Sequence, residues 1–143
     1  MKQRPDLQPS VRLWSLLVAF ERRLAHELSD LGISVSGFRL IGEVSRSPDG
    51  VRQAELARRL GVRPPTVSAA VARLEAQGLV RRVPDPDDPR ARRVLLADGV
   101  ALRPGFDVLG RMDELLCGGM PESERQQTLA ILDTLTQRLE HTK

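Results

Sequence analysis

The sequence predicts a mainly α-helical fold with a small β-hairpin wing, that is, a winged helix-turn-helix whose terminal helices form a dimerisation region. Residues 52–96 show the order short helix, glycine turn, second helix opened by Pro64 and Pro65, and two strands around an arginine-rich loop. Apolar residues also repeat every three or four positions at both ends of the chain. Aromatic residues make up only 3% of the 143 residues, so the core must consist of aliphatic side chains, which favours helices.

Long amphipathic helices are predicted on both sides of this central segment. The apolar spacing predicts helices over residues 10–31, 36–46, 100–117 and 122–140. Ser10 is the expected N-cap of the first helix and Gly32 its stop, while Pro121 marks the start of the last helix. A winged helix needs fewer residues than this chain has, so the outer helices have apolar faces that a second subunit is expected to cover.

The central segment predicts a helix over residues 53–60, a tight turn at Gly61 and a second helix from Pro64. In the second helix Val67, Val71 and Leu74 lie at positions i, i+4 and i+7 and are expected to face the core. A recognition helix inserts its N-terminal half most deeply into a DNA groove. The candidates to meet bases or phosphates are therefore Arg63, Pro64, Pro65, Thr66, Ser68 and Ala69, with Arg73 further along the exposed face.

The wing is predicted from strands at residues 79–83 and 92–96, joined by a loop with three prolines that exclude a helix. Arg90 is placed at the tip of this hairpin, with Arg92 and Arg93 beside it, where arginine can reach a minor groove or phosphates. The acidic residues of the loop are expected to pair with nearby arginines and hold the wing in shape; they are Asp85, Asp87 and Asp88. Val51 is predicted to be no more than a stub of strand.

Charge and composition narrow the function classes. The net charge is only +3, yet residues 52–93 hold ten basic and five acidic side chains, which is typical of a phosphate-binding face. The chain has no HExxH motif, phosphate-cradling glycine loop or nucleophile–histidine pair, so we expect no enzyme and no cofactor. One cysteine and two distant histidines predict no metal site, with Cys117 as inert packing. The absence of a signal peptide or apolar span predicts a cytoplasmic protein with no membrane partner.

With these features together, the chain resembles the MarR family of transcriptional regulators. The resemblance rests on AELARRLGV, PPTVSAAVARLEAQGLVRR, the DDPRARRVLL wing and a closing two-helix extension, and it covers nearly the whole chain. It implies a homodimer that reads a pseudo-palindromic operator in double-stranded DNA, with residues 1–34 and 100–143 as the helical dimerisation region and residues 35–99 as the DNA-binding domain. It also implies repression that a small aromatic or phenolic ligand relieves. Arg90 then takes the wing-tip arginine position and Asp88 the acidic position before it.

Three departures from the family pattern limit what the resemblance implies. Ala69 and Ala72 stand where many relatives have long polar residues, so base readout would depend on Thr66, Ser68, contact with thymine methyls or DNA shape. After the wing, the run Leu96-Ala97-Asp98-Gly99 is about one residue short. The chain has no cysteine near the first helix and no tyrosine, so peroxide sensing of the kind known in one branch of the family is not expected.

The effector site is the least determined element of the sequence. A phenolic acid requires an aromatic wall and a cation or hydrogen-bond donor, and the candidates are Trp14, His26, Phe38 and Arg39. Each also has an ordinary structural alternative, because Trp14 and Phe38 are residues that commonly pack in a core or interface. A winged-helix protein-interaction module without DNA binding is the alternative function. DNA affinity that falls steeply with salt would distinguish the two functions.

Overall fold

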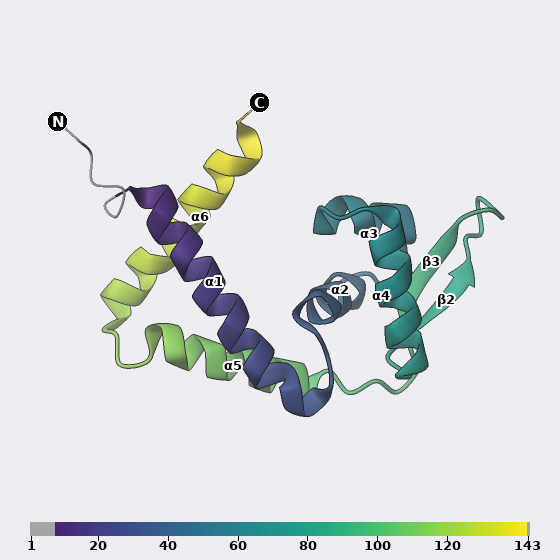
Figure 1. Cartoon of the computed structure of the whole chain (residues 1–143), viewed down its shortest axis with the longest axis horizontal. Helices are drawn as coiled ribbons and strands as arrows, with labels where there is room; N and C mark the ends of the chain where they lie inside the picture. Colours follow the sequence, from purple (N-terminus) through teal and green to yellow (C-terminus); the bar gives the residue numbers. More distant parts are fainter. Residues whose placement is uncertain (1–7, 143) are drawn as a thin grey trace. The chain divides into compact units, whose positions relative to one another are not determined.

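The computed structural model describes residues 8–142 of the chain. The chain divides into two compact units, Met1–Gly105 and Phe106–Lys143. The first unit contains all the helices and strands up to the wing and the first residues of α5, and the second contains the rest of α5 and α6 (Figure 1). This content confirms the mainly helical fold with a small sheet, and each unit is described by itself below.

The first helix, α1 (Pro9–Leu28), ends in a 3₁₀ turn, η2 (Ser29–Leu31). Ser10 was expected to be its N-cap, but the helix begins one residue earlier, because a proline fits the first turn without loss of a hydrogen bond. Gln8 is the N-cap instead. The stop at Gly32 is confirmed, since this residue adopts the left-handed backbone at φ 64° that ends the turn.

The second helix, α2 (Val35–Ser45), begins and ends one residue before the predicted range. Its N-cap is Ser34, whose Oγ accepts a hydrogen bond from the Gly37 amide at 3.0 Å. Three of its apolar side chains are buried, namely Leu40, Ile41 and Val44, whereas Phe38 is only half-buried. The helix therefore packs one face into the core and leaves Phe38 at the edge.

The helix-turn-helix consists of α3 (Gln53–Leu60) and α4 (Pro64–Ala76). Gly61 joins them in the left-handed conformation at φ 65°, as the sequence predicted. The predicted inward face of α4 is confirmed, since Val67, Val71 and Leu74 are at most 3% exposed. In α3, Leu56 and Ala57 are buried, whereas Ala54 is exposed.

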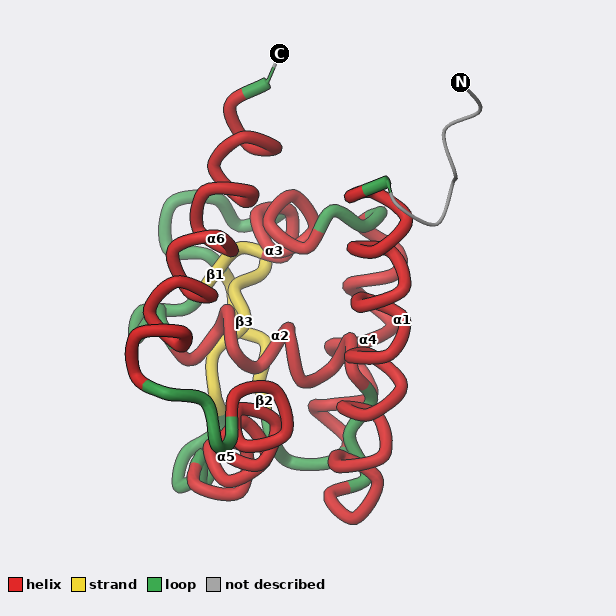
Figure 2. Tube along the Cα trace, turned by 90° about the vertical axis from the view of Figure 1, so that its left-hand side faces the viewer, coloured by secondary structure: helices red, strands yellow, loops and turns green. Residues whose placement is uncertain are grey.

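A three-stranded antiparallel sheet completes the winged segment, in the order β1 (Val51–Arg52), β3 (Arg92–Leu96) and β2 (Val80–Pro84). Figure 2 shows β3 between its two neighbours. The Val51 stub is confirmed as a strand that pairs with Val94, and β2 lies one residue later than predicted. Gly50, at φ 84°, lets the chain pass close to β3, since a Cβ there would lie 2.9 Å from Leu95 Cγ.

One aliphatic core holds α2, α3, α4 and the sheet together. Its buried members are Leu40, Ile41, Val44, Val51, Leu56, Ala57, Val67, Ala70, Val71, Leu74, Val80 and Val94. No aromatic residue is among them, as the composition predicted. Because α4 and both wing strands contribute to the same core, the recognition helix and the wing are held in a defined relative position.

The second unit contains most of α5 (Arg103–Cys117) and α6 (Glu122–His141). The helix predicted from residue 100 starts only at Arg103. Among the described side chains of α6 none is buried, and its leucine face, made of Leu129, Leu132, Leu135 and Leu139, is 39–72% exposed. No helix in residues 8–142 combines the length and apolar composition needed to cross a membrane.

Candidate nucleic-acid interface

The N-terminal half of α4 presents the residues that the sequence predicted for DNA contact. Arg63 is the N-cap of the helix, and its carbonyl accepts hydrogen bonds from the amides of Thr66 at 3.0 Å and Val67 at 3.3 Å. Pro64 and Pro65 occupy the first turn, where a missing N–H costs nothing. All the predicted contact residues of this helix are exposed except Ser68, which is half-buried; they are Arg63, Pro64, Pro65, Thr66, Ala69 and Arg73.

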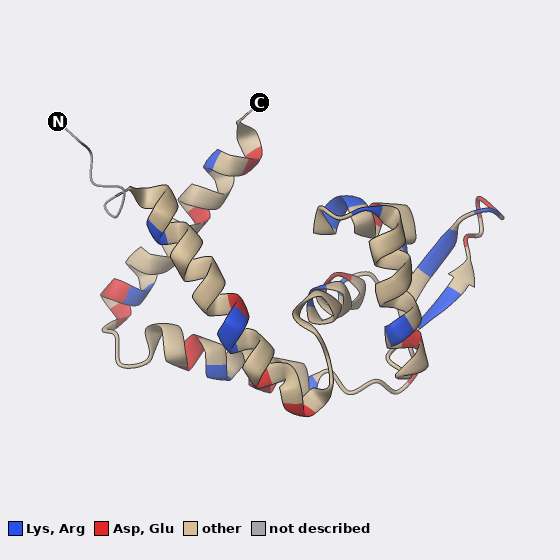
Figure 3. Cartoon of the chain, viewed as in Figure 1, with Lys and Arg blue, Asp and Glu red and all other residues tan. Residues whose placement is uncertain are grey.

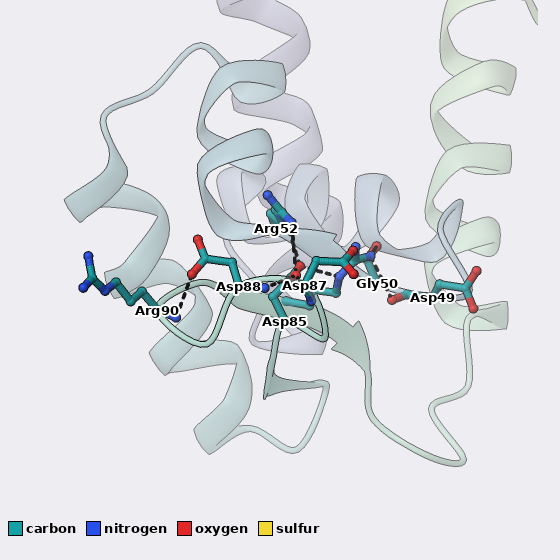
Figure 4. A network of polar contacts seen from close by, with 8 residues as sticks. Asp49, Gly50, Arg52, Asp85, Asp87, Asp88 and Arg90 are labelled. Atoms are coloured by element: carbon teal, nitrogen blue, oxygen red, sulfur yellow. Dashed lines mark hydrogen bonds and ion pairs between the residues drawn. The ribbon is translucent and has the colours of Figure 1, made fainter.

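The base of the wing contains a buried carboxylate, that of Asp85, directly after β2. Arg52 of β1 binds it in a bidentate pair, with Nε 2.8 Å from Oδ2 and an Nη 3.0 Å from Oδ1 (Figure 4). Arg93 of β3 donates from Nε to Oδ2 at 2.7 Å. The amides of Asp87 and Asp88 donate to Oδ1 at 2.8 and 3.1 Å. The Asp85 side chain is fully buried, and it joins β1, β3 and the wing loop in one network.

This network shifts the ionisation of its members. Hydrogen bonds from Arg52 and from the Asp87 amide, together with the Arg93 guanidinium, hold the pKa of Asp85 well below its usual 3.8, although burial alone would raise it. The same contact with Asp85 raises the pKa of Arg52. Asp85 is therefore charged throughout the neutral range, and each of its oxygens is satisfied by donors.

At the tip of the wing Asp88 orients Arg90 through the backbone. Asp88 Oδ1 accepts a hydrogen bond from the Arg90 amide at 3.0 Å, and the Arg90 side chain extends away from the network (Figure 4). The prediction that the wing aspartates pair with arginine side chains is thus confirmed for Asp85, whereas Asp88 holds a backbone amide. Arg90 is left with an exposed guanidinium on a loop of constrained shape.

The three predicted wing arginines differ in their environment. Arg92 is exposed, like Arg90, but Arg93 has a side chain only 24% exposed and bound to Asp85. An Nη of Arg93 also lies 3.4 Å from the carbonyl oxygens of Asp49 and Gly50. Arg93 is therefore part of the ion-pair network at the base of the wing.

Several other arginines of the winged segment are held by carboxylates. Arg58 and Arg59 both bind Glu55 at 2.6–2.9 Å, and these hydrogen bonds, that of Arg58 first, lower the pKa of Glu55 to about 2. Arg82 donates to Glu75 from its side chain and its amide at 3.1 Å, which lowers the pKa of Glu75.

A smaller set of arginines has no such partner. Within residues 35–99, all of them described, the arginines with no carboxylate within 4.0 Å are Arg39, Arg63, Arg73, Arg90 and Arg92. Figure 3 shows basic residues on the wing strands and on α3. The ion pairs divide these cations into those neutralised within the fold and those available to an external anion.

The predicted effector residues do not lie around one hollow. Trp14 is 73% exposed on α1, and His26 lies twelve residues further along the same helix, roughly 18 Å away at the rise of an α-helix. Phe38 lines a cavity of about 230 Å³, whereas Arg39 lines a separate groove between α2 and α4. Neighbours in the sequence thus reach different sites, because successive residues of a helix point about 100° apart.

The cavity at Phe38 contains residues that the sequence did not indicate. Its walls come from η2, α2, the end of α4 and the segment after the wing: Leu31, Ile33, Phe38, Ile41, Gln77, Leu79, Val100, Ala101, Leu102, Pro104 and Gly105. Gln77 is the one polar side chain in this lining, and its Nε2 donates to the Gly32 carbonyl at 2.8 Å. Residues from positions 31 to 105 meet here only through the tertiary fold, so sequence spacing held no signal for them.

The described residues contain no cluster of three or more histidine, cysteine or acidic side chains that could hold a metal ion. Cys117 is a half-buried free thiol on α5.

Comparison with known proteins finds a family model that matches part of the chain and solved structures with a similar fold. Residues 31–91 match the family model of the MarR family. Wild-type MarR from E. coli in its apo form has a TM-score of 0.79 at 21% identity, covering 90% of this chain and 96% of that one. A MarR transcriptional regulator from Methanosarcina mazei Go1 has a TM-score of 0.81 at 22% identity, covering 90% and 94%. S. aureus MepR in a DNA complex has a TM-score of 0.75 at 22% identity, covering 92% and 98%. These likenesses establish a shared winged-helix fold over most of the chain.

The Asp85 network generates a prediction about stability. The change Asp85→Asn keeps the shape of the side chain but leaves Arg52 and Arg93 without their counter-charge, so we expect the melting temperature at pH 7 to fall by about 5 °C or more. Asp87→Asn is the matched control, since Asp87 is exposed and contributes its backbone amide. Thermal unfolding followed by circular dichroism measures both. Equal melting temperatures for the two variants would contradict the role of Asp85.

The same network predicts a pH dependence. Because the pKa of Asp85 is lower in the folded protein than its ordinary 3.8, the stabilisation is fully present above about pH 4 and is lost as the pH falls towards the folded value. The difference in melting temperature between wild type and Asp85→Asn should therefore be constant near neutrality and shrink below about pH 4.

Proposed function

We propose that the chain is a MarR-family transcriptional regulator that represses transcription by binding an operator in double-stranded DNA as a homodimer. The observation that supports the proposal most directly is the placement of the unpaired arginines. Arg63 and Arg73 lie on α4, and Arg90 and Arg92 lie on the wing, while most other arginines of the domain bind carboxylates. Free guanidinium groups on a helix and an adjacent wing suit the phosphates beside two neighbouring grooves.

The outward face of α4 indicates how such a protein would recognise the bases of its operator. Pro65, Ala69 and Ala72 are exposed there and carry no hydrogen-bonding group on their side chains. Direct readout would then rely on Thr66 and Ser68 and on apolar contacts with thymine methyls, supplemented by sequence-dependent DNA shape.

The homodimer is proposed from apolar surface on two long helices. On α1 the exposed apolar side chains include Trp14, Leu16, Leu17 and Val18, and on α6 they include Leu129, Ile131, Leu132, Leu135 and Leu139. Contiguous exposed apolar surface of this kind is uncommon on a monomer and typical of a subunit interface. The proposed dimerisation region comprises residues 1–34 and 100–143, and we propose a cytoplasmic location for the assembled repressor.

A ligand that relieves repression is proposed to occupy the cavity at Phe38. The cavity is lined almost wholly by apolar side chains, with the Gln77 amide as its polar group, and at about 230 Å³ it is large enough for a single aromatic ring. Arg39, the cation that a phenolic acid would require, lies in a different groove. We therefore propose an uncharged aromatic ligand. A ligand here would touch Gln77, the C-cap of α4, and Leu79, directly before β2, so it could alter the position of the recognition helix relative to the wing.

The first prediction concerns the wing tip. Because the Arg90 side chain has no partner in the fold, Arg90→Ala should leave the melting temperature unchanged and weaken binding to a duplex about tenfold. Fluorescence anisotropy with a labelled 30-base-pair duplex, at several salt concentrations, measures this effect. Arg23→Ala is the charge-matched control, since Arg23 lies on α1 and pairs with Glu27 at 2.6 Å. Unchanged affinity in Arg90→Ala would exclude Arg90 from the interface, and wild-type protein that binds no duplex would favour a protein-interaction module.

The second prediction concerns the oligomeric state. Light scattering at micromolar concentration should give twice the monomer mass of 15.9 kDa. Leu132→Asp places a charge on the exposed apolar face of α6 and should shift the equilibrium towards monomer, because burial of an unpaired carboxylate is costly. Gln127→Asp, on the same helix, should leave the dimer intact. A wild-type mass near that of the monomer would refute the dimer.

The third prediction compares two ligands of similar shape and different charge. Toluene should raise the melting temperature and weaken DNA binding, whereas benzoate should do neither, because the cavity offers no cation to a carboxylate. Phe38→Leu removes the aromatic wall and should reduce the response to toluene. A stronger response to benzoate than to toluene would contradict an uncharged ligand.

A further inference from the structure

A surface groove runs between α2 and α4, beside the recognition helix. Arg39 and Ser36 line it from α2, Arg73 and Thr66 line it from α4, and Leu40 and Ala70 form part of its apolar floor. Arg39 and Arg73 are two of the unpaired arginines, and no carboxylate is among the residues that line the groove. Two arginines and two residues with hydroxyl side chains therefore line one hollow, and none of its lining residues carries a negative charge.

We infer that this groove, called the α2–α4 groove below, binds a backbone phosphate of duplex DNA, so that α2 supplies a third contact besides α4 and the wing. The inference rests on the proposed DNA-binding function and names a site within it. Arginine is suited to such a site because its planar fork can donate two hydrogen bonds to phosphate oxygens, and hydroxyl groups are common further donors.

The charge arrangement on α2 supports an external anion at Arg39. The other arginine at the end of this helix, Arg46, lies 3.4 Å from Glu43, and Glu43 also contacts Arg59 at 3.7 Å. Arg39 has no comparable partner among the described residues, although it is exposed and lies on the same helix. Arg39 and Arg73 facing one groove repel each other, and an anion between them would convert this repulsion into attraction.

The position of the groove relative to α4 favours a DNA strand over a detached anion. The residues Thr66 and Arg73 are separated by seven positions and lie along one edge of α4, between the buried face of Val67 and Val71 and the outer face of Ala69 and Ala72. A helix inserted in the major groove has a phosphate backbone on each side of it. With the outer face of α4 against the bases, this edge faces one of the two backbones.

The opposite edge of α4 has a different character. There Glu75 holds Arg82 of β2 by two hydrogen bonds of 3.1 Å, so the cation is already neutralised within the fold. The edge along α2 is thus the one with available positive charge, and contact there would set the orientation of the helix in the groove. Arg39, predicted from the sequence to bind an effector, is reassigned by this inference to the DNA interface.

The test uses the full-length protein and a labelled 30-base-pair duplex of mixed sequence, with affinity measured by anisotropy from about 50 to 200 mM salt. Arg39→Gln should weaken binding about three- to tenfold and reduce the slope of log affinity against log salt concentration by about one. Arg46→Gln is the matched control on α2 and should leave both quantities near the wild-type values, because its charge is engaged with Glu43. Arg39→Gln should fold normally, since Arg39 has no partner in the described structure.

A double variant tests whether both arginines act on the same phosphate. Arg39→Gln with Arg73→Gln should weaken binding less than the product of the two single effects, because the second loss removes a contact that the first has already weakened. Wild-type binding with an Arg39→Gln affinity and salt slope equal to those of Arg46→Gln would overturn the phosphate site alone. Failure of the wild-type protein to bind the duplex would overturn the phosphate site and the proposed function together.

Discussion

The geometry of the winged domain depends on the carboxylate of Asp85. It is buried and charged, and it is bound at once by Arg52 of β1, by Arg93 of β3 and by two amides of the wing loop. The strand β1 has only two residues, of which Val51 packs in the core, and the wing loop between β2 and β3 has seven residues. The ion pairs of Asp85 with Arg52 and Arg93 fix the base of the wing. Nearer the tip, the Asp88 side chain fixes the backbone at Arg90.

The same electrostatic principle divides the arginines of the domain into two kinds. Arginines with a carboxylate neighbour, such as Arg58 on Glu55 or Arg82 on Glu75, stabilise local structure and contribute little net positive field. Those without one, on the α2–α4 groove, the N-terminus of α4 and the wing, form the available positive surface. Net charge describes this poorly, because within residues 35–99 of a chain of net charge +3 the unpaired arginines lie on α2, at α4 and on the wing.

The aliphatic core of the winged domain and the uncharged cavity at Phe38 lie next to each other. With so few aromatic residues, the winged domain packs Leu, Val, Ile and Ala around α4, and the residues just outside this core leave space beside Phe38. The cavity is lined by Gln77, the C-cap of α4, and by Leu79, directly before β2, the strand that leads into the wing loop. In the proposed repressor, the ligand and the DNA would therefore bind adjacent parts of the winged domain.

The sequence by itself determined the order of the elements, the inward face of α4 and the position of the wing, because these depend on local spacing, on Gly61 and on the prolines at residues 64 and 65. It could not determine which arginines are free. Arg92 and Arg93 are neighbours with the same chemistry, and only the pleat of β3, which sends successive side chains to opposite faces, turns Arg93 onto Asp85 and leaves Arg92 exposed. Phe38 and Arg39 were likewise assigned together from the sequence, and the turn of α2 sends them to different hollows. Contacts between residues as far apart as Arg52 and Asp85 arise only when tertiary packing brings their strands together, and this decides the chemistry of the interface.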